Sequence, residues 1–215
     1  VGIGVEAVAW GKVGTIAASW VVSPMLAGSI AFVLYKTVQH WIHDTDNPFE
    51  QSKKVVPFYI FLVGFIISMV TLVKGLKHIG LDIDFQQSIL LSILAGIVIT
   101  IIGIFFVNRV HADTETDDEV HFANVEKVFA VLMVFTACAM AFAHGSNDVA
   151  NAIGPLAAIY SVVSSAGEIA AKATVPAWIL LIGGIGIVIG LVTYGHRVIA
   201  TVGTGITQLT PSRGF

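Results

Sequence analysis

The amino-acid sequence predicts an all-α, polytopic membrane protein with about five transmembrane segments. Of its 215 residues, 56% are hydrophobic and only 12% are charged, whereas soluble domains carry about 25% charged residues. The mean hydropathy is +0.88, and the apolar residues form runs near the ~20 residues that a helix needs to cross a bilayer. The net charge of -3 is spread along the chain, which gives no reason to expect a nucleic-acid partner. We therefore expect a multi-pass protein of the cell membrane, in contact with lipid.

Each of the five expected helices corresponds to one apolar run. The runs cover residues 13–39, 55–76, 88–108, 128–160 and 175–200. Pro24 predicts a kink in the first run, and the uncharged third run is typical of a scaffold helix. In the last run, Gly186 and Gly190 form a G-x-x-x-G spacing, which permits close helix approach.

Two polar connections could suggest cation binding, but both have a simpler interpretation. Residues 40–54 contain His43, Asp44 and Asp46, which are possible metal ligands without a second ligand cluster at metal-type spacing. Residues 109–127 carry a dense run of carboxylates, and like charges in a short run favour extended, hydrated chain. A solvated loop and a solvated acidic linker are the favoured readings.

The basic residues predict the topology if each run crosses the membrane once. One side then carries seven of the eleven basic residues: Lys36, Lys53, Lys54, Arg109, Lys127, Arg197 and Arg213. The other side carries Lys12, Lys74, Lys77 and Lys172. Because cytoplasmic loops are enriched in Lys and Arg, the first side is expected to face the cytoplasm.

The fourth run contains the most informative stretch, residues 142–155. Asp148 is its one acidic residue and His144 its one imidazole, and a carboxylate at membrane depth costs about 2.5 kcal/mol or more, so it is usually functional. Gly145 permits a helix break, and Ser146 or Asn147 can cap the next helix. Asp148 would then lie in a first turn, where the helix dipole favours negative charge.

These residues indicate a site for an anion and a cation together. A helix start inside the membrane offers free N–H groups to an anion, but Asp148 would repel that anion unless a cation lies between them. Sodium could take oxygens from Asp148 and Asn147, with Asn151 on the same helical face as Asn147; a proton on Asp148 or His144 is the alternative. His144 is also consistent with a purely structural hydrogen bond at a helix end.

The stretch Ala143–Ala152, A-H-G-S-N-D-V-A-N-A, closely resembles the G-A-N-D-V-A-N-A signature of inorganic phosphate transporters of the PiT (PHO4) family. Residues 19–28 and 209–215 support the resemblance. The resemblance implies an inverted-repeat transporter with a broken helix at the substrate site, and symport of inorganic phosphate with sodium or, in some members, protons. It also implies a homodimer, phosphate carried in some members as a metal complex, and phosphate-site roles for Asn147 and Asp148 with Ser146 and Asn151 beside them.

The resemblance implies two repeats, each with an N-D signature and a later P-V-S-T-T-H signature. The sequence contains one N-D signature and no P-V-S-T-T-H signature. We therefore expect an internal fragment with three parts: residues 1–108 as the end of the first repeat with scaffold helices, 109–127 as an acidic cytoplasmic linker, and 128–215 as the start of the second repeat. By itself such a fragment is not expected to transport phosphate.

Two other classes of function were weighed. A non-transporting membrane scaffold or assembly subunit would use the Gly-rich last run for packing and Asp148 as a structural acid. An intramembrane enzyme is not supported, because the apolar runs contain no acid pair, H-E-x-x-H motif or Ser/His pair of catalytic type. No enzymatic activity and no cofactor are expected, apart from the coupling sodium or proton.

Overall fold

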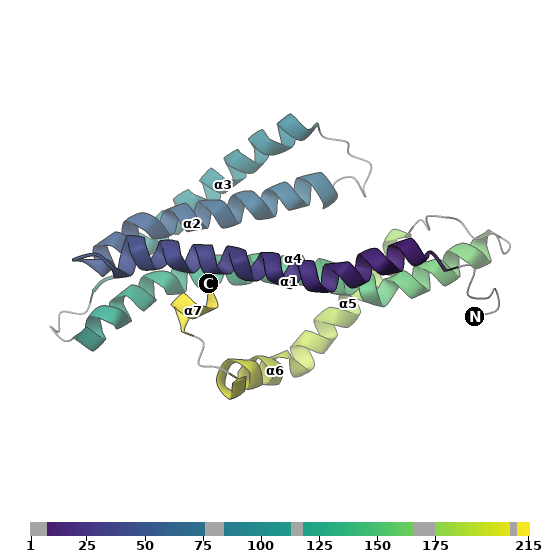
Figure 1. Ribbon diagram of the computed structural model, residues 1–215. Coiled ribbons are helices and arrows are strands. Elements are labelled where there is room, and N and C mark those ends of the chain that lie inside the picture. The colour runs from purple at the N-terminus through teal and green to yellow at the C-terminus, as the bar shows by residue number, and fades with distance from the viewer. Residues whose placement is uncertain (1–7, 76–83, 113–117, 166–174, 207–209) are drawn as a thin grey trace. The chain divides into compact units, whose positions relative to one another are not determined.

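The computed structural model describes residues 8–75, 84–112, 118–165, 175–206 and 210–215, and all regular structure within these ranges is helical (Figure 1). The helices are α1 (Trp10–Val38), α2 (Pro48–Val70), α3 (Phe85–Asn108), α4 (Asp118–Ser164), α5 (Ala177–Gly190), α6 (His196–Ala200) and α7 (Pro211–Gly214). Short π-helical turns extend several of them, at Gln39–His43, Thr71–Gly75, Leu191–Gly195 and Thr201–Ile206.

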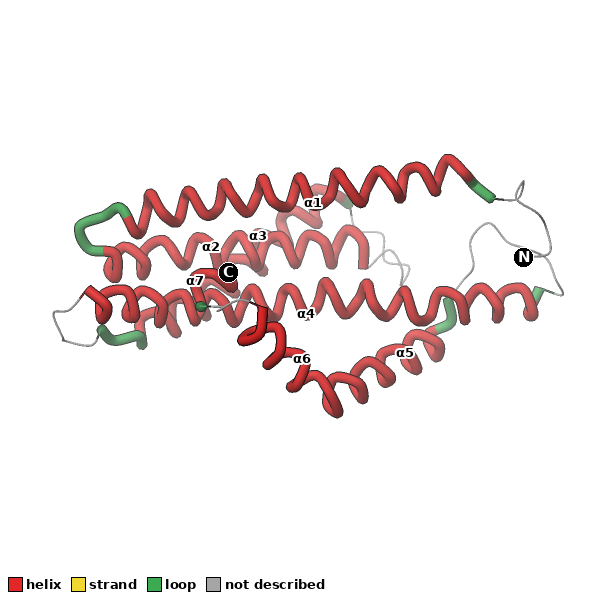
Figure 2. The backbone as a smooth tube through the Cα atoms, turned by 60° about the horizontal axis from the view of Figure 1, so that its bottom comes forward, coloured by secondary structure: helices red, strands yellow, loops and turns green. Residues whose placement is uncertain are grey.

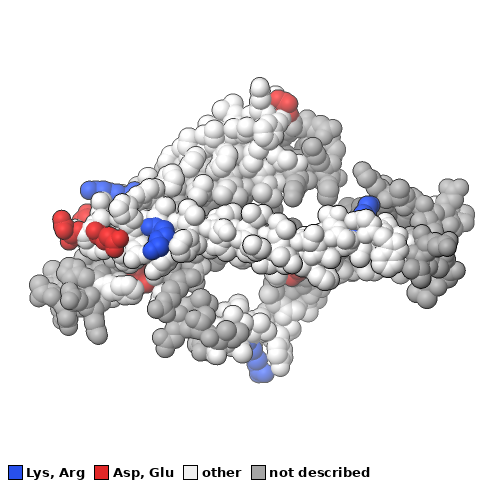
Figure 3. Space-filling model, in the orientation of Figure 1, with Lys and Arg blue, Asp and Glu red and all other residues white. Residues whose placement is uncertain are grey.

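Within the described ranges, five helical spans are long and apolar enough to cross a membrane, which agrees with the predicted number. They are Trp10–His43, Pro48–Val73, Phe85–Asn108, Phe122–Ser164 and Ala177–Gly203. In the space-filling view of Figure 3, uncharged residues cover most of the visible described surface, and charged side chains form only small patches. This surface suits a helical bundle that is surrounded by lipid or by other apolar protein.

The chain divides into two compact units, residues 1–51 and 52–215. In the first unit, α1 continues as an α-helix through Pro24, and the π-helical turn Gln39–His43 follows directly. The second unit contains most of α2 and all the helices from α3 to α7. These two units reflect which residues pack together. The predicted division into residues 1–108, 109–127 and 128–215 concerns the repeats of the transporter, and it stays a prediction.

The main core of the second unit involves the start of α2, the end of α3 and the start of α4. Gly103 of α3 lies against Ile60 of α2, and α3 contacts α4. Phe215 lies against both Tyr59 of α2 and Phe129 of α4. Its buried apolar side chains are Val56, Tyr59, Ile60, Val107, Val125, Val128, Phe129 and Leu132. They recur at helical spacing along α2 and α4, so each helix presents one continuous apolar face to its neighbours. This core fixes one end of α4.

Helix α4 is longer than the sequence predicted, because residues 118–127 form its first turns. The extended chain that was expected over 109–127 is therefore not found at these residues, while 113–117 lie outside the described part of the chain and the acidic linker itself stays a prediction. With 47 residues, α4 is about 70 Å long, roughly twice what a single crossing of a ~30 Å hydrocarbon core requires.

A second, smaller packing contact joins α4 to α5. Ile153, Ala157 and Ile179 are buried in it, with Val149 packed against them. A Cβ on Gly183 would lie 2.4 Å from Ile153 Cγ2, so only glycine permits this approach. The prediction that Gly186 and Gly190 provide the close contact is wrong within the described residues, since a Cβ on either would meet nothing within 4 Å.

Gly183→Ala is expected to lower the free energy of unfolding by about 2 kcal/mol, because the new methyl group overlaps Ile153 Cγ2. The measurement is thermal or denaturant unfolding of the purified chain in detergent. Gly186→Ala is the matched control and should be neutral or slightly stabilising. Ile153→Ala is itself destabilising, because Ile153 is buried in the same contact, but in that background Gly183→Ala should cost less than in the unmodified chain. An equal cost of Gly183→Ala in both backgrounds would contradict the steric explanation.

Candidate functional site

The predicted site residues all lie within α4, but the helix is not broken there. The α-helical conformation runs without interruption from Asp118 to Ser164, so the predicted break at Gly145 and the helix start at Ser146 or Asn147 are wrong for this structure. Gly145 does not interrupt the backbone hydrogen bonds of an otherwise apolar helix, and Pro155 is also accommodated inside it. Neighbouring groups in membrane helices commonly make such residues tolerable.

Ser146 does not cap a helix. Its Oγ donates a hydrogen bond to the backbone carbonyl oxygen of Ala143, 3.0 Å away. A serine inside a helix commonly bonds back to the preceding turn in this way. Its hydroxyl is therefore already engaged with the backbone of its own helix.

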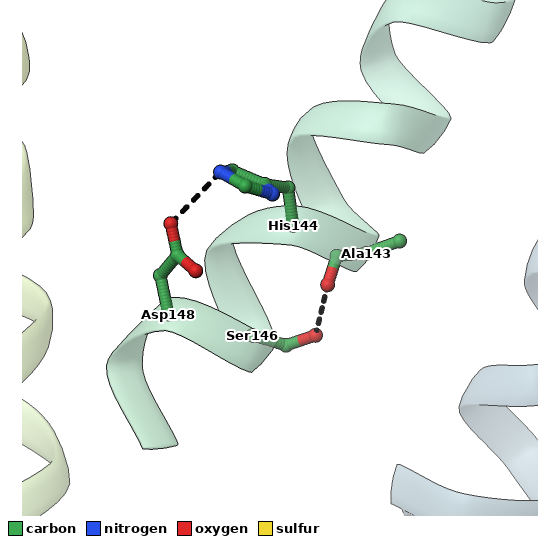
Figure 4. Close-up of polar contacts among 4 residues, drawn as sticks. All are labelled: Ala143, His144, Ser146 and Asp148. Atoms are coloured by element: carbon green, nitrogen blue, oxygen red, sulfur yellow. Dashed lines mark hydrogen bonds and ion pairs between the residues drawn. The ribbon is translucent and has the colours of Figure 1, made fainter. Parts of the chain in front are cut away.

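His144 and Asp148 form a pair that the sequence analysis did not identify. His144 Nε2 lies 2.8 Å from Asp148 Oδ2, one helical turn apart, and the two side chains are 70% and 43% exposed (Figure 4). The i, i+4 spacing was the signal that could have found it. The imidazole occupies one carboxylate oxygen and leaves the other available to a further ligand.

Four of the five candidates share one face of α4. His144, Asn147, Asp148 and Asn151 follow the spacing i, i+3, i+4 and i+7, which places them along one helical stripe. Ser146 is about 200° round the helix from His144, and Figure 4 shows its side chain on the other side of the helix from the His144–Asp148 pair. We call the four-residue stripe the polar face of α4.

The polar face points largely away from the face of α4 that packs on α5. Val149 and Ile153, which belong to the α5 contact, are about 100° and 120° round the helix from the nearest member of the polar face. His144, Asn147 and Asn151 are exposed and Asp148 is half-buried. These side chains of the polar face are thus accessible to a ligand.

The described residues contain no preformed metal cluster. Among them, no three His, Cys, Asp or Glu side chains come together as potential ligands of a metal ion. His43, Asp44 and Asp46 are among the described residues and do not come together in this way; the solvated loop between α1 and α2 stays a prediction. The oxygens that could hold a cation on α4 are those of Asp148, Asn147 and Asn151.

The fold, the apolar spans and the polar face inside one of them define a multi-pass α-helical membrane protein. The family is given by comparison with known proteins. A model of the phosphate transporter family matches residues 1–215, and the chain belongs to that family.

Individual relatives agree with this assignment. The chain is 45% identical to a protein of Haemophilus influenzae that is predicted to be a phosphate permease, over 99% of this chain and 50% of the relative. It is 34% identical to the chloroplastic inorganic phosphate transporter 2-1 of Arabidopsis thaliana, over 99% of this chain and 39% of the relative.

A solved structure described as the sodium-dependent phosphate transporter matches with a TM-score of 0.83 and 38% identity, covering 99% of this chain and 50% of that one. The all-helical membrane fold that the sequence predicted is thereby confirmed. The chain spans half or less of the length of these three proteins.

Proposed function

We propose that this chain forms about half of a transporter that moves inorganic phosphate across a membrane together with a cation. The observation that carries the proposal is the polar face of α4, which lies inside a 43-residue apolar span. Polar and ionisable groups at such positions are unfavourable in lipid and usually belong to a substrate or ion pathway. Membership of the phosphate transporter family supports phosphate as the substrate.

The proposed cation resolves an electrostatic conflict on the polar face. Phosphate can accept hydrogen bonds from the amide groups of Asn147 and Asn151, but the carboxylate of Asp148 would repel it. A cation bound to the free oxygen of Asp148 would turn that repulsion into attraction, and opposite charges interact more strongly in a low-dielectric site than in water. Binding of phosphate and of the cation would therefore be coupled.

Sodium is the coupling ion that we favour. The solved structure with 38% identity is described as sodium-dependent. Sodium is a hard cation, and hard cations prefer oxygen ligands such as those of a carboxylate and of side-chain amides. A proton is the alternative, for which His144 beside Asp148 offers a second protonation site.

The polar face supplies only one side of the proposed site. Four exposed or half-buried side chains on one helix do not surround an ion, so we propose that the remaining ligands come from protein outside these 215 residues. The coverage of about half the length of the relatives supports this view. An inverted-repeat organisation, with 1–108, 109–127 and 128–215 as its parts here, belongs to the same proposal.

Transport by the full-length protein that contains this sequence, called the parent transporter, tests the proposal. It is reconstituted in liposomes, and uptake of radiolabelled phosphate is measured under an inward sodium gradient or an inward proton gradient. We expect uptake with the sodium gradient, and none by the 215-residue chain reconstituted alone, because its site is incomplete.

Three outcomes would contradict this scheme. Absence of phosphate uptake by the parent transporter under either gradient would exclude cation-coupled phosphate transport. Uptake driven by the proton gradient alone would replace sodium with a proton. Uptake by the isolated 215-residue chain would show that these residues contain a whole phosphate site and not one side of it.

A further inference from the structure

Glu126, near the start of α4, binds a segment that lies far away in the sequence. Its Oε2 accepts a hydrogen bond from the backbone N–H of Ser212, with the nitrogen 2.8 Å away, and its Oε1 accepts one from the hydroxyl of Ser212. Both residues are half-buried. Both oxygens of this carboxylate therefore bind Ser212. Hydrogen bonds to an ionised group are about twice as strong as neutral ones, so this is a strong contact for a single residue pair.

Apolar contacts surround this carboxylate contact. The ring of Phe215 lies 5.1 Å from that of Tyr59 and 6.2 Å from that of Phe129, measured between centroids. A Cβ on Gly214 would lie 2.6 Å from Met133 Cε, so the segment approaches α4 closely. Glu126, Phe129 and Met133 are spaced i, i+3 and i+7 and form one face of α4. We call the segment Thr210–Phe215 the latch.

Residues 177–206 lead away from α4, and the latch then brings the chain back to it. We call residues 177–206 the arch. Helix α5 contacts α4 near Ile153 and Gly183, and the latch contacts α4 near Glu126, about 40 Å away along the helix. Between these contacts, α5 and α6 lead away from α4 and the chain returns at α7 (Figures 1 and 2). The arch, Ala177–Ile206, includes two π-helical turns, a conformation that is rare and often found at functional sites.

From this geometry we infer that Glu126 is a positioning residue for transport, which anchors the latch and so fixes the far end of the arch relative to the polar face. The inference rests on the proposed function. Glu126 is about 33 Å along α4 from Asp148, so it does not touch phosphate at the polar face. Its removal should slow the conformational step of transport and leave phosphate binding unchanged.

Disulfide cross-linking tests the latch directly. In a Cys138→Ser background, which removes the one cysteine of the chain, Met133→Cys is combined with Gly214→Cys. Met133 Cγ, whose position a cysteine Sγ would take, lies 3.7 Å from the position of a Cβ on Gly214, so a small adjustment brings the two sulfur atoms within bonding distance, and replacing Met133 also removes the Cε atom that a Cβ on residue 214 would meet. We expect rapid oxidation of this pair, and slow oxidation of Val134→Cys with Gly214→Cys, because Val134 is on another face of α4.

Glu126→Ala should slow the cross-link about tenfold, because two charge-assisted hydrogen bonds are lost. Glu126→Gln keeps one acceptor oxygen and should slow the cross-link by an intermediate amount. This variant tests the anchoring role if the alanine variant folds poorly. Glu50→Gln, an exposed acid on α2, is the control and should not alter the rate. An unchanged rate in both Glu126 variants would overturn the anchoring role.

Phosphate uptake by the parent transporter tests the role in transport. Glu126→Gln is expected to lower the maximal rate per transporter about fivefold, with the half-saturating phosphate concentration changed by less than about twofold. A purely structural role would reduce the amount of folded protein and not the rate of each molecule. An unchanged rate, or a shift in half-saturation alone, would overturn the positioning role. If the unmodified transporter takes up no phosphate, the proposed function fails, while cross-linking still decides the anchoring.

Discussion

Asp148→Asn is expected to abolish cation-driven phosphate uptake by the parent transporter without preventing its insertion into the membrane. The substitution keeps the shape of the side chain and removes its negative charge, which is the group proposed to hold the cation beside phosphate. It also weakens the contact with His144, now 2.8 Å from the carboxylate. If the rest of the parent transporter excludes water from the proposed site, losing one partner of a charge pair there lowers affinity by about 100-fold.

The measurement compares initial rates of phosphate uptake with the amount of folded transporter in the same liposomes. Asp84→Asn provides the matched control, because Asp84 is an exposed acid at the N-cap of α3 whose side chain makes no cap hydrogen bond. The control should retain uptake. Retained uptake in Asp148→Asn as well would favour the scaffold hypothesis, in which Asp148 is only a structural acid.

The fold could be predicted from the sequence because a bilayer allows few alternatives. A run of about 20 apolar residues must form a helix in lipid so that its backbone groups are hydrogen-bonded. The apolar runs therefore located the five spans. Their ends were harder to predict, since residues 118–127 include six charged or polar residues and are still helical. Local charge favours solvation there, whereas Val125 is buried in the core and stabilises the helix.

The sequence identified the polar residues of the candidate site but not the conformation of the helix that carries them. The residues Gly145, Ser146 and Asn147 have weak local preferences for a break and a cap. In the structure the helix retains its own hydrogen bonds, and Ser146 bonds to Ala143 instead. Local propensity cannot decide between these states, because in lipid the intrahelical hydrogen bonds of an unbroken helix outweigh it. The identity of the polar residues in an apolar run was the dependable signal.

The contact between Glu126 and Ser212 could not have been predicted from one sequence. The two residues are 86 positions apart, and neither belongs to a spacing pattern that points to the other. Their meeting depends on the packing of α5 on α4 and on the aromatic contacts of Phe215. The same holds for Gly183, which resembles its neighbours Gly184 and Gly186 in sequence but is the one of these three that faces a side chain.

Phe129→Ala is expected to cause the largest loss of stability, about 3 kcal/mol in the free energy of unfolding. Phe129 is fully buried in the main core and its ring also contacts Phe215 of the latch. In a membrane protein the unfolded helices remain in apolar surroundings, so the loss arises from missing contacts and the cavity rather than from transfer out of water. The estimate is therefore at the low end of the usual range for buried Phe.

Unfolding of the purified chain in detergent measures this effect, with Phe142→Ala as the matched control on the same helix. Phe142 is 52% exposed, so its truncation leaves no cavity and should change stability by less than about 0.5 kcal/mol. Equal destabilisation by the two substitutions would contradict the core defined by α2, α3 and α4. Because Phe129 supports both this core and the latch, Phe129→Ala should also slow the cross-link between residues 133 and 214, whereas Phe142→Ala should not.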